Sequence, residues 1–243
     1  MKNQYAGDVN DFRKYAILRA LASCRIKISI CWMLTADDSG SDGRRVRYLQ
    51  EPKTWARLDP ELYASLGESI ARTRTRSVAD IEKCVLLDGF RFYGDPVPPD
   101  RTRRAAFLTA LLEKSSGTAD LIFFDPDNGV RDRRFTRSPS EKHLYWHEVT
   151  TAFAWGFSVV FYQHFPRLPR NEFIGQGARI AAARTGATCI YSFQTPDVVF
   201  FLIAQDRHRE NLSAVSNAPA GWGEQIRVRV HSFGSVRLGM GLS

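Results

Sequence analysis

The stretch LIFFDPDNGV, residues 121–130, decides the fold of this chain. Four apolar residues, too few for a helix but enough for a buried strand, end at the carboxylate of Asp125. A proline, two small polar residues and a glycine follow, which is the composition of a turn. In open α/β sheets ligands bind beyond the carboxyl ends of the strands. The stretch therefore predicts a strand that delivers a reactive loop, although an ordinary strand exit uses the same residue types.

The composition is that of a globular protein with a basic surface. A chain of 243 residues, 44% of them hydrophobic, is long enough to bury a proper core. No break in composition marks a boundary, so a single α/β domain over residues 1–243 is expected. The formal net charge of +8 favours an anionic partner, with nucleic acid first. A solvated basic surface without a specific partner remains the alternative.

The cysteines and the start of the chain bear on location. Cys24, Cys31, Cys84 and Cys189 are scattered and form no C-x-x-C pair, which argues against a zinc site. They are typical of small core residues in a reducing compartment. The first residues contain no apolar signal region, and no run approaches the ~18 apolar residues of a membrane span. A cytoplasmic protein without membrane association is expected, and no resident metal.

Helical and strand periodicities alternate along the chain. This alternation predicts a doubly wound, mostly parallel sheet covered by helices on both faces. Two strands close together near the end, at 188–193 and 198–204, predict one antiparallel strand in that sheet. The other strands are expected near residues 26–34, 85–93, 121–124 and 157–162, and the helices near 10–23, 60–70, 78–84, 104–114, 145–155 and 171–185.

Four short motifs follow one another along the chain. Residues 5–16 read YAGDVNDFRKYA, residues 31–48 combine a strand with a glycine-containing loop, residues 92–95 read FYGD, and residues 125–128 read DPDN. In this order they resemble the motifs of the class I S-adenosylmethionine-dependent methyltransferases. The nearest group is the bacterial methyltransferases that act on N6 of adenine in ribosomal RNA. The resemblance covers about 200 residues, and its weight lies in the shared order, because each motif alone is short.

The resemblance implies a Rossmann-like methyltransferase fold and S-adenosylmethionine as cofactor. The first motif is similar to that group's opening HAGNxADxxKH, and the last stands where the group has Asp-Pro-Pro-Tyr. In that group the tyrosine stacks on the extruded base, whereas this chain has asparagine there, so a different methyl acceptor stays open. The residues implied at the cofactor are Gly7, Asp11, Lys14, Asp38, Gly40, Gly43 and Asp95.

The residues at the strand exit, 125–128, also suit methyl transfer on chemical grounds alone. Methyl transfer from a sulfonium mainly needs the acceptor held in line, and positioning can supply ~7–11 kcal/mol of the barrier. Asp125 and the Pro126 carbonyl can accept an N–H of an amine acceptor, while Asp127 or Asn128 orients it. His164 follows another strand and would reach the same sheet edge, as base, metal ligand or phosphate contact. Hydrogen-bonded filler is its ordinary alternative.

Two other functions stay open. Asp125, Asp127 and His164 together offer oxygen and imidazole ligands for a divalent metal, as in a nuclease or phosphodiesterase. A basic protein that binds nucleic acid without catalysis, on a degenerate methyltransferase fold, is the non-enzymatic alternative. Methyltransferase activity on RNA or DNA is the first expectation.

A basic loop, expected over residues 131–142, directly follows the strand exit. Its cations would grip phosphates without regard to sequence at the mouth of the site. A solvated insertion is the alternative. The nucleic-acid contacts expected there are Arg131, Arg133, Arg134, Arg137 and Lys142.

Overall fold

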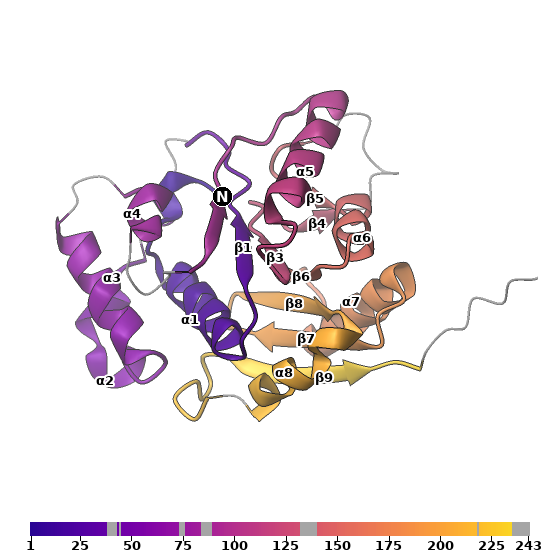
Figure 1. The fold of residues 1–243 in the computed structure, drawn as a ribbon. Helices are drawn as coiled ribbons and strands as arrows, with labels where there is room; N and C mark the ends of the chain where they lie inside the picture. The colour runs from indigo at the N-terminus through magenta and orange to yellow at the C-terminus, as the bar shows by residue number, and fades with distance from the viewer. Residues whose placement is uncertain are drawn as a thin grey trace, which may run out of the picture.

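A seven-stranded mixed sheet organises the computed structural model, which describes residues 1–37, 43, 45–72, 76–83, 89–131, 140–217 and 219–234 (Figure 1). The strand order is β2-β1-β3-β6-β8-β7-β9. The strands are β1 (Ile28–Cys31), β2 (Arg91–Tyr93), β3 (Leu121–Phe124), β6 (Ser158–His164), β7 (Cys189–Gln194), β8 (Val198–Ala204) and β9 (Arg227–Ser232). A separate two-stranded ladder pairs β4 (Val130–Arg131) with β5 (Leu144–Tyr145).

The sheet is divided into a parallel half and an antiparallel half. β2, β1, β3 and β6 pair in parallel, whereas β6, β8, β7 and β9 pair antiparallel. The expected hairpin of β7 and β8 is confirmed, but the expectation of a mostly parallel sheet with one antiparallel strand is wrong. The reason is β9, an edge strand reading RVRVHS, whose alternating arginines leave it half exposed and weaken its apolar signal.

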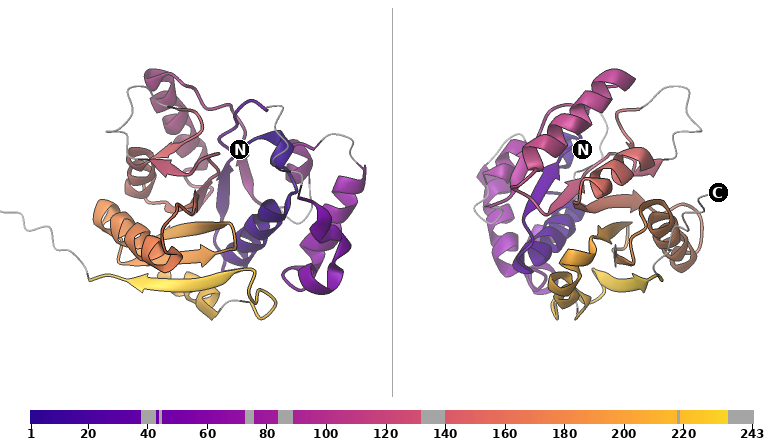
Figure 2. Two further views of the ribbon diagram at one scale, coloured as in Figure 1. Left: turned by 180° about the vertical axis from the view of Figure 1, so that it is seen from behind. Right: turned by 45° about the vertical axis from the view of Figure 1, so that its right-hand side comes forward.

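Helices cover both faces of the sheet and enclose two cores (Figures 1 and 2). On one face lie α1 (Val9–Ser23), α3 (Pro60–Arg72), α4 (Val78–Glu82) and α8 (Arg209–Ser213). On the other lie α5 (Arg101–Ser115), α6 (Trp146–Ala154) and α7 (Arg170–Thr185). The short helices are α2 (Pro52–Trp55) and the 3-10 turns η1 (Asn3–Tyr5), η2 (Arg47–Gln50), η5 (Asp206–His208) and η6 (Ala214–Asn217).

The first helix departs from a simple amphipathic pattern. Its N-cap is Asp8, two residues before the expected Asn10, and the Asp8 carboxylate accepts the backbone N–H groups of Asn10 and Asp11 at 2.8 and 2.9 Å. Charged residues of the first two turns, among them Asp11 and Lys14, are buried together with the apolar ones. Because buried charges need partners, this end of α1 must face other polar groups.

Three of the four cysteines lie in the described part of the chain. Cys31 and Cys189 are buried in the two cores, Cys24 is partly buried, and all three are free thiols, as expected for small core residues. Cys84 lies outside the described residues. Within the described part, no helix has both the length and the apolar character needed to cross a membrane.

The connections place a ligand site at one end of the sheet. The chain passes from β1 outward to β2 beside helices of one face, and returns through α5 on the other face to β3. The order therefore reverses between β1 and β3, and the carboxyl edge at such a switch point is where open α/β sheets bind ligands. Asp125 follows β3, and His164 ends β6, at this same edge.

Candidate functional site

A cavity of about 440 Å³ opens at the carboxyl edge, between the N-terminal end of α1 and the exits of β3 and β6. That volume is within the usual range for a small-molecule site. Its lining also includes Met1, Tyr5, Arg45 and Tyr162, which sequence reasoning missed. Of the residues expected at the site from the sequence, the cavity is lined by Asp11, Lys14, Gly43, Asp125, Asp127, Asn128 and His164.

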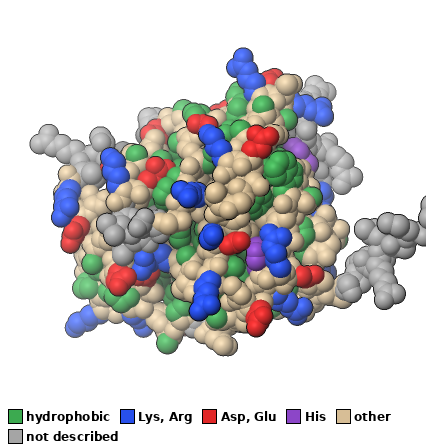
Figure 3. All heavy atoms as spheres, in the orientation of Figure 1, with side chains coloured by type: hydrophobic (Ala, Val, Ile, Leu, Met, Phe, Trp, Pro, Cys, Tyr) green, Lys and Arg blue, Asp and Glu red, His purple; other side chains and the backbone are tan. Residues whose placement is uncertain are grey.

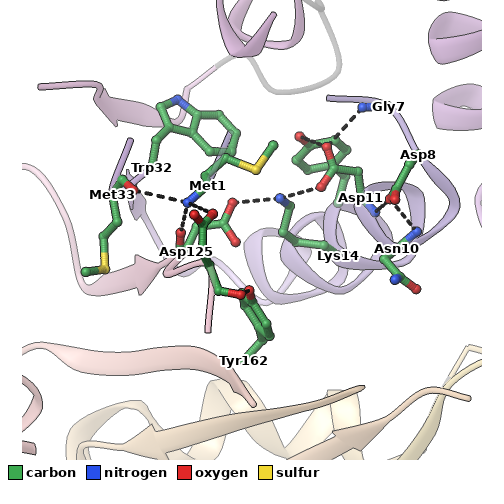
Figure 4. Close-up of polar contacts among 12 residues, drawn as sticks. Met1, Gly7, Asp8, Asn10, Asp11, Lys14, Trp32, Met33, Asp125 and Tyr162 are labelled. Atoms are coloured by element: carbon green, nitrogen blue, oxygen red, sulfur yellow. Dashed lines mark hydrogen bonds and ion pairs between the residues drawn. The ribbon is translucent and has the colours of Figure 1, made fainter. Parts of the chain in front are cut away.

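Lys14 links the first of the four sequence motifs, residues 5–16, to the last, residues 125–128. Its ammonium nitrogen lies 2.6 Å from Asp11 Oδ1 and donates a hydrogen bond to Asp125 Oδ2 at 2.8 Å (Figure 4). All three side chains are at most 7% exposed. Burial lowers the pKa of Lys14 while the carboxylates of Asp11 and Asp125 raise it, and the net direction is upward. Lys14 is therefore a fixed cation that holds the strand-exit carboxylate against α1.

Asp11 connects the Lys14 ammonium to residues near the start of the chain. Its second oxygen accepts the Gly7 backbone N–H at 2.9 Å and the Tyr15 hydroxyl at 3.0 Å. Gly7 has φ +77°, a backbone conformation that residues with a side chain rarely adopt, so glycine is needed there. Gly7 therefore serves the site through its backbone rather than by lining the cavity.

The ammonium group of Met1 joins the chain beyond β1 to the chain beyond β3. It donates hydrogen bonds to the backbone carbonyls of Met33, at 3.1 Å, and of Asp125, at 2.9 Å (Figure 4). The same nitrogen lies 2.8 Å from Asp127 Oδ1, and the residue is only 4% exposed. The cavity consequently extends beside α1 rather than over β1. Nothing in the local sequence around Met1 indicates this position, because the partners lie 32 and 124 residues away along the chain.

The loop after β3 is held rigid on several sides. Pro126 is buried, and the Asp127 carboxylate accepts the Thr35 hydroxyl at 2.6 Å in addition to pairing with Met1. The backbone carbonyl of Asp127 accepts the Tyr162 hydroxyl and lies 3.2 Å from Nε2 of His164. The Asp127 side chain is therefore committed within the protein, whereas Asn128 is exposed at the rim of the cavity.

Two carboxyl groups at the cavity, those of Asp8 and Asp125, have raised pKa values. Burial, together with the neighbouring Asp11 carboxylate, raises the pKa of Asp8 to about 6, although two backbone N–H groups and Arg45 oppose the rise. Burial also raises the pKa of Asp125, against the lowering effect of Lys14. Carboxylates are thus gathered at the cavity in a chain of net charge +8. Perturbed groups of this kind, gathered in a cleft, are typical of functional sites.

The base of the basic loop is fixed immediately beyond this site. The backbone N–H of Asn128 donates to the Lys142 carbonyl at 2.8 Å. Two residues further along each segment, β4 pairs with β5. Arg104 also anchors the returning chain, since it pairs with Glu148 at 2.6 Å and donates to backbone carbonyls of residues 140 and 143. Arg131 and Lys142 are exposed at this base, while Arg133, Arg134 and Arg137 lie outside the described residues.

Some of the residues expected at the cofactor do not reach the cavity. Asp95 is exposed just beyond β2, on the far side of β1 from β3, and does not line it. Asp38 and Gly40 lie outside the described residues. Gly43 lines the cavity, has φ +80°, and packs against Gln4 and Tyr5 so closely that a Cβ would not fit. The second motif, residues 31–48, therefore contributes Gly43 and Arg45 to the lining of the cavity.

Fold and site together define an α/β protein with a charged, ligand-sized cavity at the switch point of its sheet. No family model and no curated protein matches the chain. Among solved structures it is similar to protein LPL1258 from Legionella pneumophila str. Philadelphia 1, described by the family model DUF519, with a TM-score of 0.44 and 11% sequence identity over 93% of this chain and 98% of that one.

Proposed function

We propose that this protein is an S-adenosylmethionine-dependent methyltransferase that acts on nucleic acid. The observation that carries the proposal is the contact between Lys14 and Asp125 at 2.8 Å, across 111 residues of sequence. The resemblance assigns the first of these residues to a cofactor segment and the second to an acceptor segment. Chemistry between a cofactor and an acceptor requires two such segments to meet at one cavity.

The cavity has the size and the charge that such a cofactor needs. About 440 Å³ accommodates a ligand of nucleoside size, and a sulfonium cation would be favoured by the carboxylate of Asp8, which caps α1 and is not paired with Lys14. Tyr5 and Asn10, which line the cavity, would contact the cofactor from the α1 side. Bound there, S-adenosylmethionine would supply the methyl group.

The protein's own residues would position the acceptor. The Asp125 carboxylate, oriented by Lys14, would accept an N–H of an acceptor amine and hold its nitrogen toward the cavity. Asn128, exposed at the rim, would contact the rest of the acceptor. Asp127 is better described as a positioning residue, because Met1 and Thr35 already engage its side chain.

The metal-dependent alternative has less support. Lys14 and Met1 neutralise the carboxylates of Asp125 and Asp127, and His164 points Nε2 toward a backbone carbonyl. A divalent cation at these oxygens would have to displace two internal ammonium groups. Over the described ranges, no three His, Cys, Asp or Glu side chains gather as metal ligands. No specific observation favours cleavage over methyl transfer.

The test is a calorimetric titration with S-adenosylmethionine and S-adenosylhomocysteine, followed by transfer of a tritiated methyl group to RNA, DNA and nucleotides. We expect micromolar binding, about −8 kcal/mol. Asp125→Asn should retain cofactor binding and lose at least ~10²-fold in turnover, since one misplaced polar contact can cost that much. The control is Asp120→Asn, at the opposite end of β3. A parent protein that binds neither ligand at millimolar concentration would overturn the proposal, and nucleic-acid cleavage with manganese would favour the alternative.

A further inference from the structure

The loop of residues 165–170, FPRLPR, leaves the cavity directly after His164. β3 and β6 are parallel neighbours, with Phe124 opposite Phe161, so their exits continue side by side. The distance of 3.2 Å between His164 Nε2 and the Asp127 carbonyl oxygen shows that the two exits stay close to each other. The loop therefore projects from the sheet edge next to the loop that contains Asp125, and anything entering the cavity from this side passes it.

Rigidity distinguishes this loop from an ordinary surface turn. Pro166 and Pro169 fix two of its six backbone φ angles, and the Leu168 N–H donates to the Pro166 carbonyl at 2.8 Å. Phe165 anchors it, edge to face on Phe173 of α7 with 6.1 Å between ring centroids. The tip is thus held in one shape before any ligand arrives, which lowers the entropic cost of binding.

The tip presents an apolar side chain between two cations. Leu168 is 50% exposed, among the most exposed large apolar side chains of the described chain. Arg167 and Arg170 are also exposed, and neither is ion-paired with a carboxylate in the described ranges. The carbon atom of the Arg170 guanidinium lies 4.9 Å from the Phe165 ring centroid, a cation–π contact that holds this cation beside the loop. A single exposed leucine is common on proteins, but one framed by unpaired arginines at the mouth of a cavity suits a ligand with anions and apolar rings.

We infer that this loop holds a single-stranded or unpaired segment of nucleic acid, with Arg167 and Arg170 on phosphates and Leu168 against the base beside the target nucleotide. The inference rests on the proposed function and names the form of its substrate. Arg167 and Arg170 lie three residues apart, a backbone span of at most about 10 Å, so both side chains can contact one short stretch of a single strand. A base that must enter a buried cavity leaves its stack, and an apolar wedge next to it compensates the loss.

The experiment compares fluorescence-anisotropy binding of labelled single-stranded RNA, single-stranded DNA and duplex over a range of salt concentrations. Arg167→Gln with Arg170→Gln should reduce the slope of log K against log salt by about 1.4, at ~0.7 per phosphate contact on a single strand. Leu168→Gln should weaken single-strand binding by at least about fivefold. Both variants should bind S-adenosylhomocysteine as tightly as the parent, which shows that they are folded.

Matched controls lie elsewhere on the surface. Arg72→Gln, at the end of α3 on the opposite face of the sheet, should leave the slope unchanged, and Val230→Gln, 42% exposed on β9, controls for the loss of an exposed apolar side chain. Loop variants that behave like these controls, a parent that prefers duplex, or a parent that binds no nucleic acid would each overturn the inference. Failure of the parent to bind cofactor would overturn the proposed function alone, because the loop effects are read from nucleic-acid binding.

Discussion

At Lys14 one ammonium group serves two carboxylates inside the protein. Removing one partner of such a buried ionic group typically lowers the free energy of unfolding by about 3–5 kcal/mol. That is a large fraction of the whole stability of a domain. The arrangement persists here in part because the second oxygen of Asp11 has donors of its own, the Gly7 backbone N–H and the Tyr15 hydroxyl. The same residues therefore hold α1 against β3 and orient Asp125, so stability and the proposed function are coupled at this position.

Asp8→Asn is expected to stabilise the protein near neutral pH. Burial raises the pKa of Asp8 from 3.8 to about 6. Because the folded-state pKa is the higher one, the stability that protonated Asp8 provides is complete below about pH 4 and is lost as pH rises through about 6. Asparagine caps a helix as well as aspartate does but stays neutral. The gain in unfolding free energy at pH 7.5 should reach at most about 3 kcal/mol and vanish at pH 4.

Urea denaturation between pH 4 and pH 8 measures this effect. The matched control is Asp100→Asn at the N-cap of α5, which is exposed and accepts the Arg103 N–H in the same way. The control should leave the pH profile close to that of the parent. A gain from Asp8→Asn that is equal at pH 4 and at pH 8 would show that charge is not its origin.

At the scale of elements, α7 is packed on the sheet through small residues. Its buried positions include Ala178, Ala181 and Ala182, and Gly177 lies against Phe201 of β8. Helix and sheet can approach closely only because these side chains are short. This close packing fixes the start of α7, and with it the loop at residues 165–170, relative to the end of β6.

Gly177→Ala and Gly175→Ala should have opposite effects in the same helix. A Cβ at Gly177 would lie 2.5 Å from the Phe201 ring, so the helix must shift, at a cost of about 1–3 kcal/mol. At Gly175 the nearest atom is the Arg179 guanidinium at 3.7 Å, and alanine should stabilise by roughly 0.5–1 kcal/mol through helix propensity. Thermal denaturation of both variants measures the difference. Equal effects at the two positions would contradict the packing.

For the whole molecule, the two cores share one sheet, and long-range strand pairing runs through all seven strands. Figure 3 shows Lys and Arg side chains scattered among Asp and Glu over the face seen in Figure 1, rather than gathered in one patch. We expect the net charge of +8 to attract polyanions generally, while selection among them would fall to the groups at the sheet edge.

Heat should unfold the chain in one transition, with far-UV circular dichroism and tryptophan fluorescence coinciding, because neither core is complete without the shared sheet. S-adenosylhomocysteine at 100 times its Kd adds about 2.7 kcal/mol, which should move the whole transition upward by roughly 5–10 °C. Two separated transitions, of which only one responds to the ligand, would contradict a single cooperative domain.

Local patterns in the sequence predicted the elements and part of the site. The apolar runs ending at Asp125 and near His164 marked two strands of the sheet, because periodicity and turn chemistry are local properties. The ordered motifs also brought Gly7, Asp11 and Lys14 into consideration, and the structure places all three at or directly behind the cavity. The half-exposed strand β9 was missed, since its arginines alternate with valines at an edge, where burial is too weak to produce a clear apolar pattern.

The sequence by itself determined the α/β alternation, the hairpin of β7 and β8, and the carboxylate at the end of β3. The tertiary structure alone decided that Lys14 meets Asp125, that the Met1 ammonium joins the ends of β1 and β3, and that Asp95 stays apart from the cavity. The physical reason is the distance along the chain over which each interaction acts. Hydrophobic periodicity acts within one element, whereas an ion pair across 111 residues depends on how the elements pack, and no local pattern encodes that.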